Sequence, residues 1–313
     1  MTLRALGLVT SAWRSFYAEQ ETALARAGVA YDTLEVPGEH RAFDDRVARR
    51  SPADYARFYG RVLRHGLDDY DVVHANYGLT APFAVAQPRR PVVVSLWGGE
   101  FVGNRFAPLV RASVERADAV VVPSQAMVQR LPASVRCRTT VVPFPVDTET
   151  FQPESRAAAR EAVGWGTDAP VVLFPYAQDR YEKNYALAER VVEGLDVDAE
   201  LRSVANEPYE RMPHYMNASD ALLVTSRWES GPMTVKEALA CDLPVVSRPV
   251  GFVPDLLDGV RNCHVGATER DLREALAATF ADGRPADGRA RVRATDTETM
   301  GAALRRVYAR CLE

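Results

Sequence analysis

The chain has 313 residues, a length that suits two average domains better than one small core. Its hydrophobic fraction of 47% and charged fraction of 26% lie in the globular range and exclude a disordered or low-complexity chain, while a net charge of -4 argues against general nucleic-acid binding. No apolar run approaches the ~20 residues of a transmembrane helix, and the N-terminus lacks a secretory signal, so we expect a cytoplasmic protein.

The four cysteines, at positions 137, 241, 263 and 311, show no Cys-x-x-Cys spacing. Such scatter argues against both a zinc site and a disulfide framework. No Asp-x-Asp, His-x-x-x-His or other clustered ligand set stands where a metal would need it. We therefore expect no metal and no cofactor.

Short apolar runs alternate with helical patterns along the first half of the chain. The predicted strands cover 5–10, 30–36, 71–74, 91–96, 119–122 and 139–142, and the predicted helices cover 16–27, 51–66, 105–117 and 124–131. This alternation is typical of βαβ units around a parallel sheet, so an α/β fold is expected.

The alternation stops at residues 143–153, where three prolines interrupt any regular element, and then restarts. Strands are predicted at 170–175, 201–204, 221–225 and 244–247, helices at 154–163, 184–195, 208–217 and 233–241, and a last helix at 297–311. We assign a first domain to 1–148, a second to 149–295, and a C-terminal helix to 296–313, for which a return to the first domain is one option. Two such domains favour a ligand in the cleft between the carboxyl ends of their strands.

The most informative segment follows the strand that ends at Thr225. A Ser-Gly-Pro turn leads into a helix that begins near Met233. Pro232 stands at the start of this helix, where a backbone N–H would have no partner within the helix, so the lack of one in proline costs nothing. Free backbone amides and the positive end of the helix dipole make such a start a phosphate site. Glu237 lies one turn further, on an otherwise apolar or small side, and a buried carboxylate there needs partners such as ribose hydroxyls. The alternative is a solvated glutamate.

Glu229 and Glu237, with seven residues between them, stand in a stretch that resembles the paired-glutamate signature of the retaining family 4 glycosyltransferases. Residues 118–127 and 143–153 look like the segments that close the family's first domain, and 174–184 looks like its donor-phosphate loop. The resemblance runs over nearly the whole chain. It implies the GT-B fold, in which two Rossmann-like parallel-sheet domains face a central cleft.

The resemblance also implies roles for residues of the second domain. Glu229, Arg180 and Lys183 would be the catalytic residues, with Arg180 and Lys183 on the diphosphate because both follow a strand and precede a helix. Glu237 would hold the ribose. The remaining donor-binding candidates are Ser230, Gly231, Pro232, Met233 and Thr234. Lys236 points to the neighbouring side of the helix and is expected to be solvated.

The first domain departs from the family pattern. Its first loop carries Ser11 and Ser15 in place of glycines, and Trp97 and Glu100 stand where many relatives have a stretch with a site histidine. His74 is predicted to end a strand that faces the same cleft, with a purely structural role as the alternative. The candidates on the acceptor side or in the cleft are Ser11, Ser15, His74, Asn76, Trp97 and Glu100.

Residues 40–65 combine seven arginines with three acids and several aromatic residues. Such a segment suits an anionic membrane or a phosphorylated lipid acceptor, with Arg57, Arg61 and Arg64 on phosphate and Phe58, Tyr59 and Leu63 at the acyl region. The alternative is a solvated helix face. A peripheral contact with the inner membrane face is therefore a further expectation.

The sequence predicts a metal-independent glycosyltransferase that moves a sugar from a nucleotide diphosphate sugar to an acceptor hydroxyl with retention. The acceptor is a sugar, a small molecule or a lipid-linked molecule, and no nucleic acid is involved. The alternatives are another GT-B enzyme, such as an epimerase or an inverting transferase, and a non-catalytic sugar-nucleotide sensor. Turnover of a donor distinguishes the sensor from the enzymes.

Overall fold

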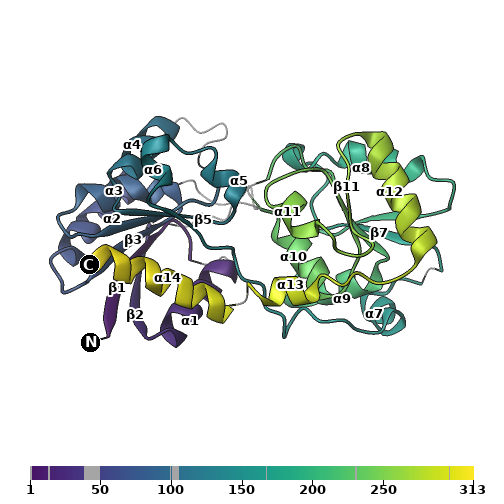
Figure 1. Cartoon of the computed structure of the whole chain (residues 1–313), viewed down its shortest axis with the longest axis horizontal. Helices are drawn as coiled ribbons and strands as arrows, with labels where there is room; N and C mark the ends of the chain where they lie inside the picture. Colours follow the sequence, from purple (N-terminus) through teal and green to yellow (C-terminus); the bar gives the residue numbers. More distant parts are fainter. Residues whose placement is uncertain are drawn as a thin grey trace. The chain divides into compact units, whose positions relative to one another are not determined.

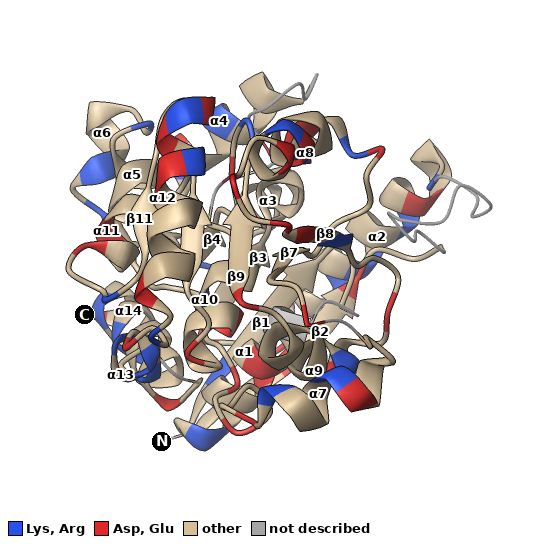
Figure 2. Cartoon of the chain, turned by 90° about the vertical axis from the view of Figure 1, so that its right-hand side faces the viewer, with Lys and Arg blue, Asp and Glu red and all other residues tan. Residues whose placement is uncertain are grey.

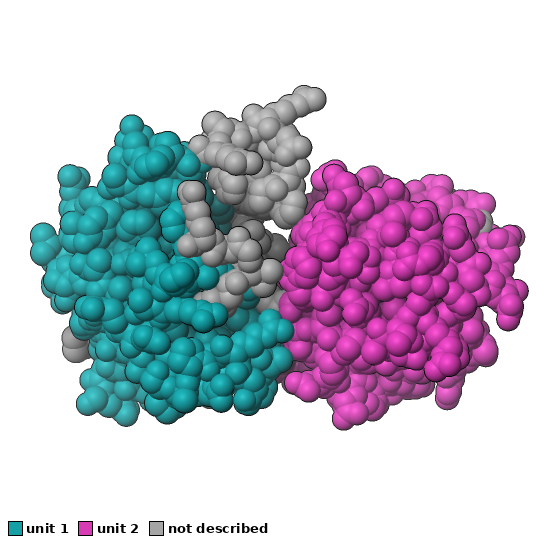
Figure 3. Space-filling view, turned by 90° about the horizontal axis from the view of Figure 1, so that it is seen from above, with its two compact units in different colours: residues 1–145, 297–313 teal, residues 146–296 magenta. Residues whose placement is uncertain are grey.

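A computed structural model describes residues 2–12, 15–38, 50–98, 100, 106–166, 168–229, 231–295 and 297–313. The chain divides into two compact units, one made of residues 1–145 and 297–313 and the other of residues 146–296 (Figure 3). The predicted boundaries lie at 148/149 and at 295/296, where the C-terminal helix is expected to begin. The structure divides the chain after Pro145 and Asp296.

Unit 1 contains a parallel sheet with strand order β2-β1-β3-β4-β5-β6. Its strands are β1 (Leu3–Val9), β2 (Val29–Glu35), β3 (Val72–Asn76), β4 (Val92–Ser95), β5 (Ala119–Val122) and β6 (Thr139–Val141). Every residue of β3, β4 and β5 is buried, because helices cover both faces of the sheet. The valine-rich runs in these strands reflect that two-sided burial.

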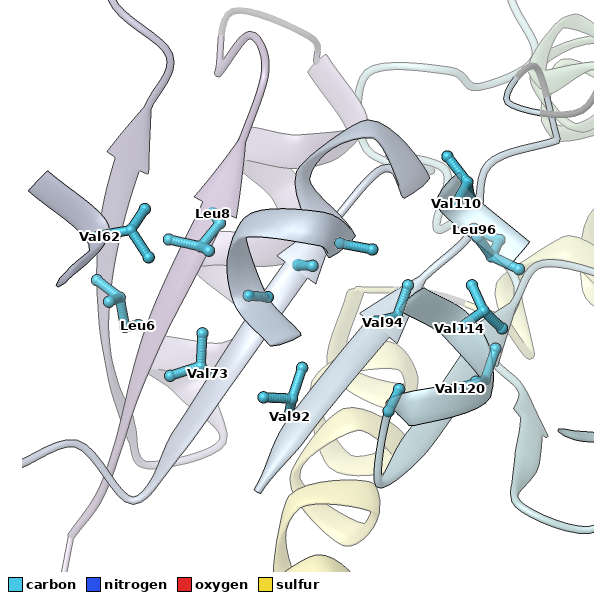
Figure 4. Close-up of a cluster of buried hydrophobic side chains, with 14 of the residues drawn as sticks. Leu6, Leu8, Val62, Val73, Val92, Val94, Leu96, Val110, Val114 and Val120 are labelled. Atoms are coloured by element: carbon cyan, nitrogen blue, oxygen red, sulfur yellow. The ribbon is translucent and has the colours of Figure 1, made fainter. Parts of the chain in front are cut away.

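The helices of unit 1 form two layers. They are α1 (Ser15–Arg26), α2 (Pro52–His65), η1 (Gly78–Thr80), α3 (Ala81–Ala86), α4 (Ala107–Arg116), α5 (Gln125–Val128), α6 (Ala133–Arg136) and α14 (Thr297–Leu312). One face of the sheet packs on α2, α3 and α4. In Figure 4, Val62 of α2 lies beside Leu6 and Leu8, and Val110 and Val114 of α4 lie beside Leu96 and Val120. The other face packs on α1 and α14.

The C-terminal helix α14 belongs to unit 1 although it follows unit 2 in the sequence. Met300, Leu304 and Tyr308 are buried against the sheet, and Figure 1 shows α14 beside α1. Gly301 permits this close approach, because a Cβ there would lie 2.1 Å from the Ala23 carbonyl oxygen.

Unit 2 contains a second parallel sheet, with order β11-β10-β9-β7-β8. Its strands are β7 (Val171–Phe174), β8 (Glu200–Ser203), β9 (Ala221–Val224), β10 (Val245–Ser247) and β11 (His264–Val265). Its helices are α7 (Arg156–Val163), η2 (Tyr181–Lys183), α8 (Tyr185–Glu193), η3 (Tyr209–Arg211), α9 (Met212–Ala218), α10 (Met233–Ala240), α11 (Val253–Leu257), α12 (Glu269–Asp282) and α13 (Arg289–Arg293). The helices α8 and α12 cover one face and α9, α10, α11 and α13 the other.

The two parallel sheets, each with helices on both faces, confirm the predicted α/β fold class. Acidic and basic residues are interspersed on helices such as α4 and α7 (Figure 2). Across the described residues, no helix combines the length and apolar character needed to cross a bilayer.

Candidate functional site

Two loops of unit 2 meet at the carboxyl edge of its sheet, because β7 and β9 are parallel neighbours. The loop after β7 contains η2, and the loop after β9 begins at Thr225. The Thr225 hydroxyl donates to the Lys183 carbonyl oxygen at 2.9 Å, and the Arg227 N–H donates to the Glu182 carbonyl oxygen at 2.8 Å. The two loops therefore form one connected surface that carries Lys183 and Glu229.

Lys183 and Glu229 form a direct, largely buried ion pair. Glu229 also accepts a hydrogen bond from the Ser226 hydroxyl at 2.8 Å, and the Lys183 ammonium lies 3.9 Å from the centre of the Tyr176 ring. Burial lowers the pKa of Lys183, and the Glu229 carboxylate acts against that shift. The structure thus brings together two of the three residues predicted to be catalytic.

Arg180, the third residue predicted to be catalytic, forms an ion pair with Glu182 of its own loop. Its Nε donates to Glu182 at 2.7 Å, and its side chain is about one third exposed. Its charge still acts on Lys183, whose pKa it lowers. Arg180 therefore lies near the Lys183–Glu229 pair, with its guanidinium engaged by a carboxylate.

The turn that is predicted to bind phosphate lies at the start of α10. Pro232 precedes the helix, Met233 is its first residue, and the Thr234 hydroxyl lies 2.7 Å from the Tyr176 hydroxyl. Gly231 is required by packing, because a Cβ there would lie 2.2 Å from the Phe252 ring. Ser230 lies outside the described residues. The amides of the first helical turn lack intrahelical partners, so they suit an anion.

Glu237 is a buried carboxylate on α10, with only 5% of its surface exposed. The Tyr209 hydroxyl donates to its Oε1 at 3.1 Å. Burial raises the pKa of Glu237 to about 7, and the Tyr209 hydrogen bond opposes this. The site therefore holds a carboxylate that can change charge near neutral pH.

The prediction for Lys236 is wrong, because this lysine is buried with 2% of its surface exposed. Its ammonium donates to the Thr295 hydroxyl at 3.1 Å and lies 5.4 Å from the centre of the Phe252 ring. Burial lowers the pKa of Lys236 to about 8. The side predicted to be solvated is covered because α13 packs against α10.

In unit 1 the predicted acceptor-side residues lie after β1, within β3 and after β4. Ser11 is buried and accepts a hydrogen bond from Arg50 at 3.3 Å, and Ser15 begins α1 with its side chain outside the described residues. Trp97 is nearly buried, with its ring 5.3 Å from that of Tyr77. These residues lie at the carboxyl edge of the unit 1 sheet.

Glu100 connects two segments at the carboxyl edge of the unit 1 sheet. It is fully buried and accepts backbone N–H groups from Trp97 at 2.6 Å and Gly78 at 3.0 Å. Burial raises the pKa of Glu100, and these hydrogen bonds oppose the shift. The carboxylate joins the loop after β4 to the start of η1.

The structure places His74 differently from the prediction of a residue facing an open cleft. It lies inside β3, fully buried beneath α14, with Nδ1 2.6 Å from the Tyr308 hydroxyl and Nε2 2.7 Å from the Ser95 hydroxyl. Burial lowers the pKa of His74 to about 3, so the ring is neutral. Asn76 is likewise buried, and it accepts from Gln20 and donates to Tyr31, each at 2.7 Å.

The basic segment is only partly described, since residues 39–49 lie outside the described part of the chain. Phe58 was predicted to contact acyl chains, but it is fully buried in the core beneath α2. Tyr59 donates its hydroxyl to the Ala86 carbonyl oxygen at 3.2 Å. The exposed side of α2 carries Arg57, Arg61 and Leu63.

Tyr176, Tyr209 and Ser226 contact the predicted site residues but were not singled out from the sequence. Ser226 belongs to the paired-glutamate stretch, so its place beside Glu229 had a signal in the motif. Tyr176 likewise lies in the stretch 174–184 that resembles the donor-phosphate loop. Tyr209 had no such signal, because it reaches Glu237 only through the fold. Among the described residues, no group of three His, Cys, Asp or Glu side chains is placed to hold a metal.

Two helix-covered parallel sheets, one in each unit, are the architecture of the GT-B fold. Two family models match, Glycosyltransferase Family 4 over residues 8–150 and Glycosyl transferases group 1 over residues 160–282. The chain belongs to the family 4 type of glycosyltransferases. It is an enzyme of that class and uses a sugar-nucleotide donor.

Relatives with known names agree with this class. D-inositol 3-phosphate glycosyltransferase of Geodermatophilus obscurus is 28% identical, with 82% of this chain and 67% of the relative aligned. The enzyme of the same name from Mycolicibacterium smegmatis is 27% identical, with 67% of this chain and 60% of the relative aligned. The chain thus spans about two thirds of the length of these relatives.

Solved structures with the same fold cover nearly the whole chain. Sucrose-phosphate synthase from Thermosynechococcus elongatus has a TM-score of 0.77 at 18% identity, with 98% of each chain aligned. HepE of Anabaena in complex with UDP has a TM-score of 0.74 at 15% identity, with 98% of this chain and 100% of HepE aligned. At such identities the likeness concerns the fold.

Proposed function

We propose that the protein transfers a sugar from a nucleotide diphosphate sugar to an acceptor hydroxyl, with retention at the anomeric carbon and without a metal. The observation that carries the proposal is the buried Lys183–Glu229 pair in unit 2, in the loops beside α10. The donor binds unit 2, and the acceptor binds the loops at the carboxyl edge of the unit 1 sheet.

The departing nucleoside diphosphate develops negative charge, which fixed cations and amides can stabilise. Lys183 and the first-turn amides of α10 supply positive charge, and Arg180 adds to it. The donor's phosphate competes with Glu229 for the Lys183 ammonium, which frees Glu229 to accept the sugar's hydroxyls. With the buried His74 unavailable as a base, the leaving phosphate itself takes the proton of the acceptor.

The relatives' name, D-inositol 3-phosphate glycosyltransferase, selects a first acceptor to test. Purified protein would be incubated with that compound, with free inositol and with simple sugars, against UDP-, ADP- and GDP-sugars. We expect a product whose anomeric configuration by NMR matches that of the donor. An inverted product contradicts retention, an epimerised donor indicates the epimerase alternative, and donor binding without hydrolysis or transfer indicates a sensor.

Metal removal should leave the transfer rate unchanged. The positive charge opposite the leaving group is assigned to Lys183, Arg180 and the start of α10. Initial rates would be measured before and after EDTA treatment, with a known metal-dependent transferase as the control. A loss of activity in EDTA that magnesium or manganese restores contradicts metal independence.

Peripheral membrane contact remains a proposal for α2. Arg57 has 71% of its side chain exposed, Arg61 and Arg64 are also exposed, and Leu67 just beyond the helix is 75% exposed. Cations beside apolar residues suit an anionic bilayer surface, where each charge contributes about 1 kcal/mol.

Binding to anionic vesicles should therefore be salt-sensitive. Flotation with phosphatidylglycerol vesicles at low salt should carry the protein upward, whereas neutral vesicles should not. Reversal of Arg57, Arg61 and Arg64 to Glu should abolish flotation and leave UDP binding by unit 2 intact. A wild-type protein that stays in the soluble fraction at low salt contradicts membrane contact.

A further inference from the structure

We propose that Tyr209 is a positioning residue for the donor, because its hydroxyl orients the Glu237 carboxylate and supports its negative charge for a ligand hydroxyl. The proposal rests on the proposed function, in which Glu237 accepts the ribose hydroxyls. Tyr209 is outside the paired-glutamate signature and reaches the site from η3, between β8 and α9.

The Tyr209 ring is held in place by an aromatic contact with the core of unit 2. Tyr209 is the first residue of η3 and packs edge-on against Phe151, with ring centres 5.3 Å apart and planes at 60°. Phe151 is fully buried, so this contact belongs to the core of unit 2. The hydroxyl is therefore fixed 3.1 Å from Oε1 of Glu237.

This hydrogen bond leaves half of the carboxylate for a ligand. Among the described residues, the Glu237 carboxylate accepts a side-chain hydrogen bond from Tyr209 at Oε1 and none at Oε2. A carboxylate has about four acceptor positions on its two oxygens. Tyr209 can therefore stay in place when a ribose hydroxyl arrives.

The groups that face Glu237 make the Tyr209 hydrogen bond important. Tyr176, from the loop after β7, and Cys241, at the end of α10, both feel the Glu237 charge, and burial raises the pKa of each, so both are neutral near pH 7. Lys236, the preceding residue of α10, donates instead to Thr295. Burial raises the pKa of Glu237 to about 7, and Tyr209 is the hydrogen-bonding group that opposes it.

Removing the Tyr209 hydroxyl should raise the pKa of Glu237 further and reduce its ionised fraction near neutrality. A carboxylate that must be charged to accept ribose then binds more weakly at pH 7 and recovers at higher pH. A hydrogen bond to a charged group is strong enough that Tyr209→Phe should weaken nucleoside diphosphate binding at pH 7 by about fivefold or more. At pH 9 the difference should shrink to about twofold.

The experiment is calorimetric titration of the whole protein with UDP and with ADP at pH 7, 8 and 9. This range lies above the second phosphate pKa of ~6, so the ligand's charge stays nearly constant. Burial lowers the pKa of Lys236 to about 8, so Lys236 titrates here in every variant, and a comparison at each pH removes its contribution. Tyr215→Phe is the matched control, since this nearby tyrosine on α9 bonds Glu207.

Tyr209→Phe keeps the ring against Phe151, so a purely structural role predicts little change or a loss that is equal at every pH. Either result overturns the proposal. In a Glu237→Gln background, Tyr209→Phe should have no further pH-dependent effect, because no carboxylate remains to titrate. If Glu237→Gln itself leaves UDP and ADP binding unchanged, the ribose assignment fails. If Glu237→Gln weakens binding and Tyr209→Phe matches wild type at every pH, only the role of Tyr209 fails.

Discussion

Lys183→Ala should lower the sugar-transfer rate by about a hundredfold or more. Removal of one group that stabilises charge in a transition state typically costs 10²- to 10³-fold, and Lys183 is the buried cation at the carboxyl edge of unit 2. The same change should weaken binding of UDP much more than binding of uridine, because the ammonium is assigned to phosphate. Initial rates and calorimetric titrations measure the two effects.

Lys183→Ala should also destabilise unit 2, because it leaves the Glu229 carboxylate buried without its cation. Breaking a buried ion pair from one side costs ~3 kcal/mol or more. The double variant Lys183→Ala with Glu229→Gln removes both charges and should recover much of the stability while remaining inactive. That variant separates a loss of catalysis from a loss of folding. A single variant that transfers sugar at a near wild-type rate, or loses UDP and uridine binding equally, contradicts the role of Lys183.

Every described strand except β11 could be predicted from local sequence, and so could the order of the site residues in unit 2. Buried parallel strands appear as short valine-rich runs, and Val92–Ser95 and Ala119–Val122 lie inside predicted segments. Glu229 and Glu237 stand in a motif whose spacing fixes their places beside and along α10. Helix α12 was missed although its signal was present, since Thr268 and Asp271 form a capping box at its start.

Contacts between distant segments could not be predicted in this way. Tyr209 meets Glu237 only because η3 follows β8 and α10 follows β9, and no spacing along the chain encodes the 3.1 Å contact. The burial of Lys236 could not be predicted for the same reason, since α13, which covers this lysine, lies more than fifty residues further along the chain. His74 is the clearest case, because the helix that buries it lies at the far end of the chain, beyond all of unit 2.

The burial of His74 leads to a large expected effect of pH on the stability of unit 1. Burial lowers the pKa of His74 to about 3, whereas an unfolded histidine has a pKa of ~6.5. Below pH 6.5, His74 therefore binds a proton in the unfolded chain but not in the folded protein, so the folded protein loses stability as the pH falls. The linkage relation gives a loss of about 2 kcal/mol at pH 5 from this group alone.

His74→Gln isolates this contribution, because glutamine can hydrogen-bond but does not titrate near these pH values. We expect the variant to be less stable than wild type at pH 7.5, since the bonds to Tyr308 and Ser95 cannot both keep their geometry. At pH 5 the difference in unfolding free energy between wild type and variant should narrow by about 2 kcal/mol, since only the wild type loses stability through protonation of His74 in the unfolded chain. Hydrogen exchange of amides in β3 and α14 at both pH values reports the opening free energy of unit 1 separately from unit 2. Equal stability differences at pH 7.5 and pH 5 would show that His74 accepts its proton in the folded protein.

A second variant, Tyr308→Phe, leaves the imidazole in place. It should retain the steep loss of stability below pH 6.5, which would attribute the pH dependence to the His74 ring rather than to the packing of α14.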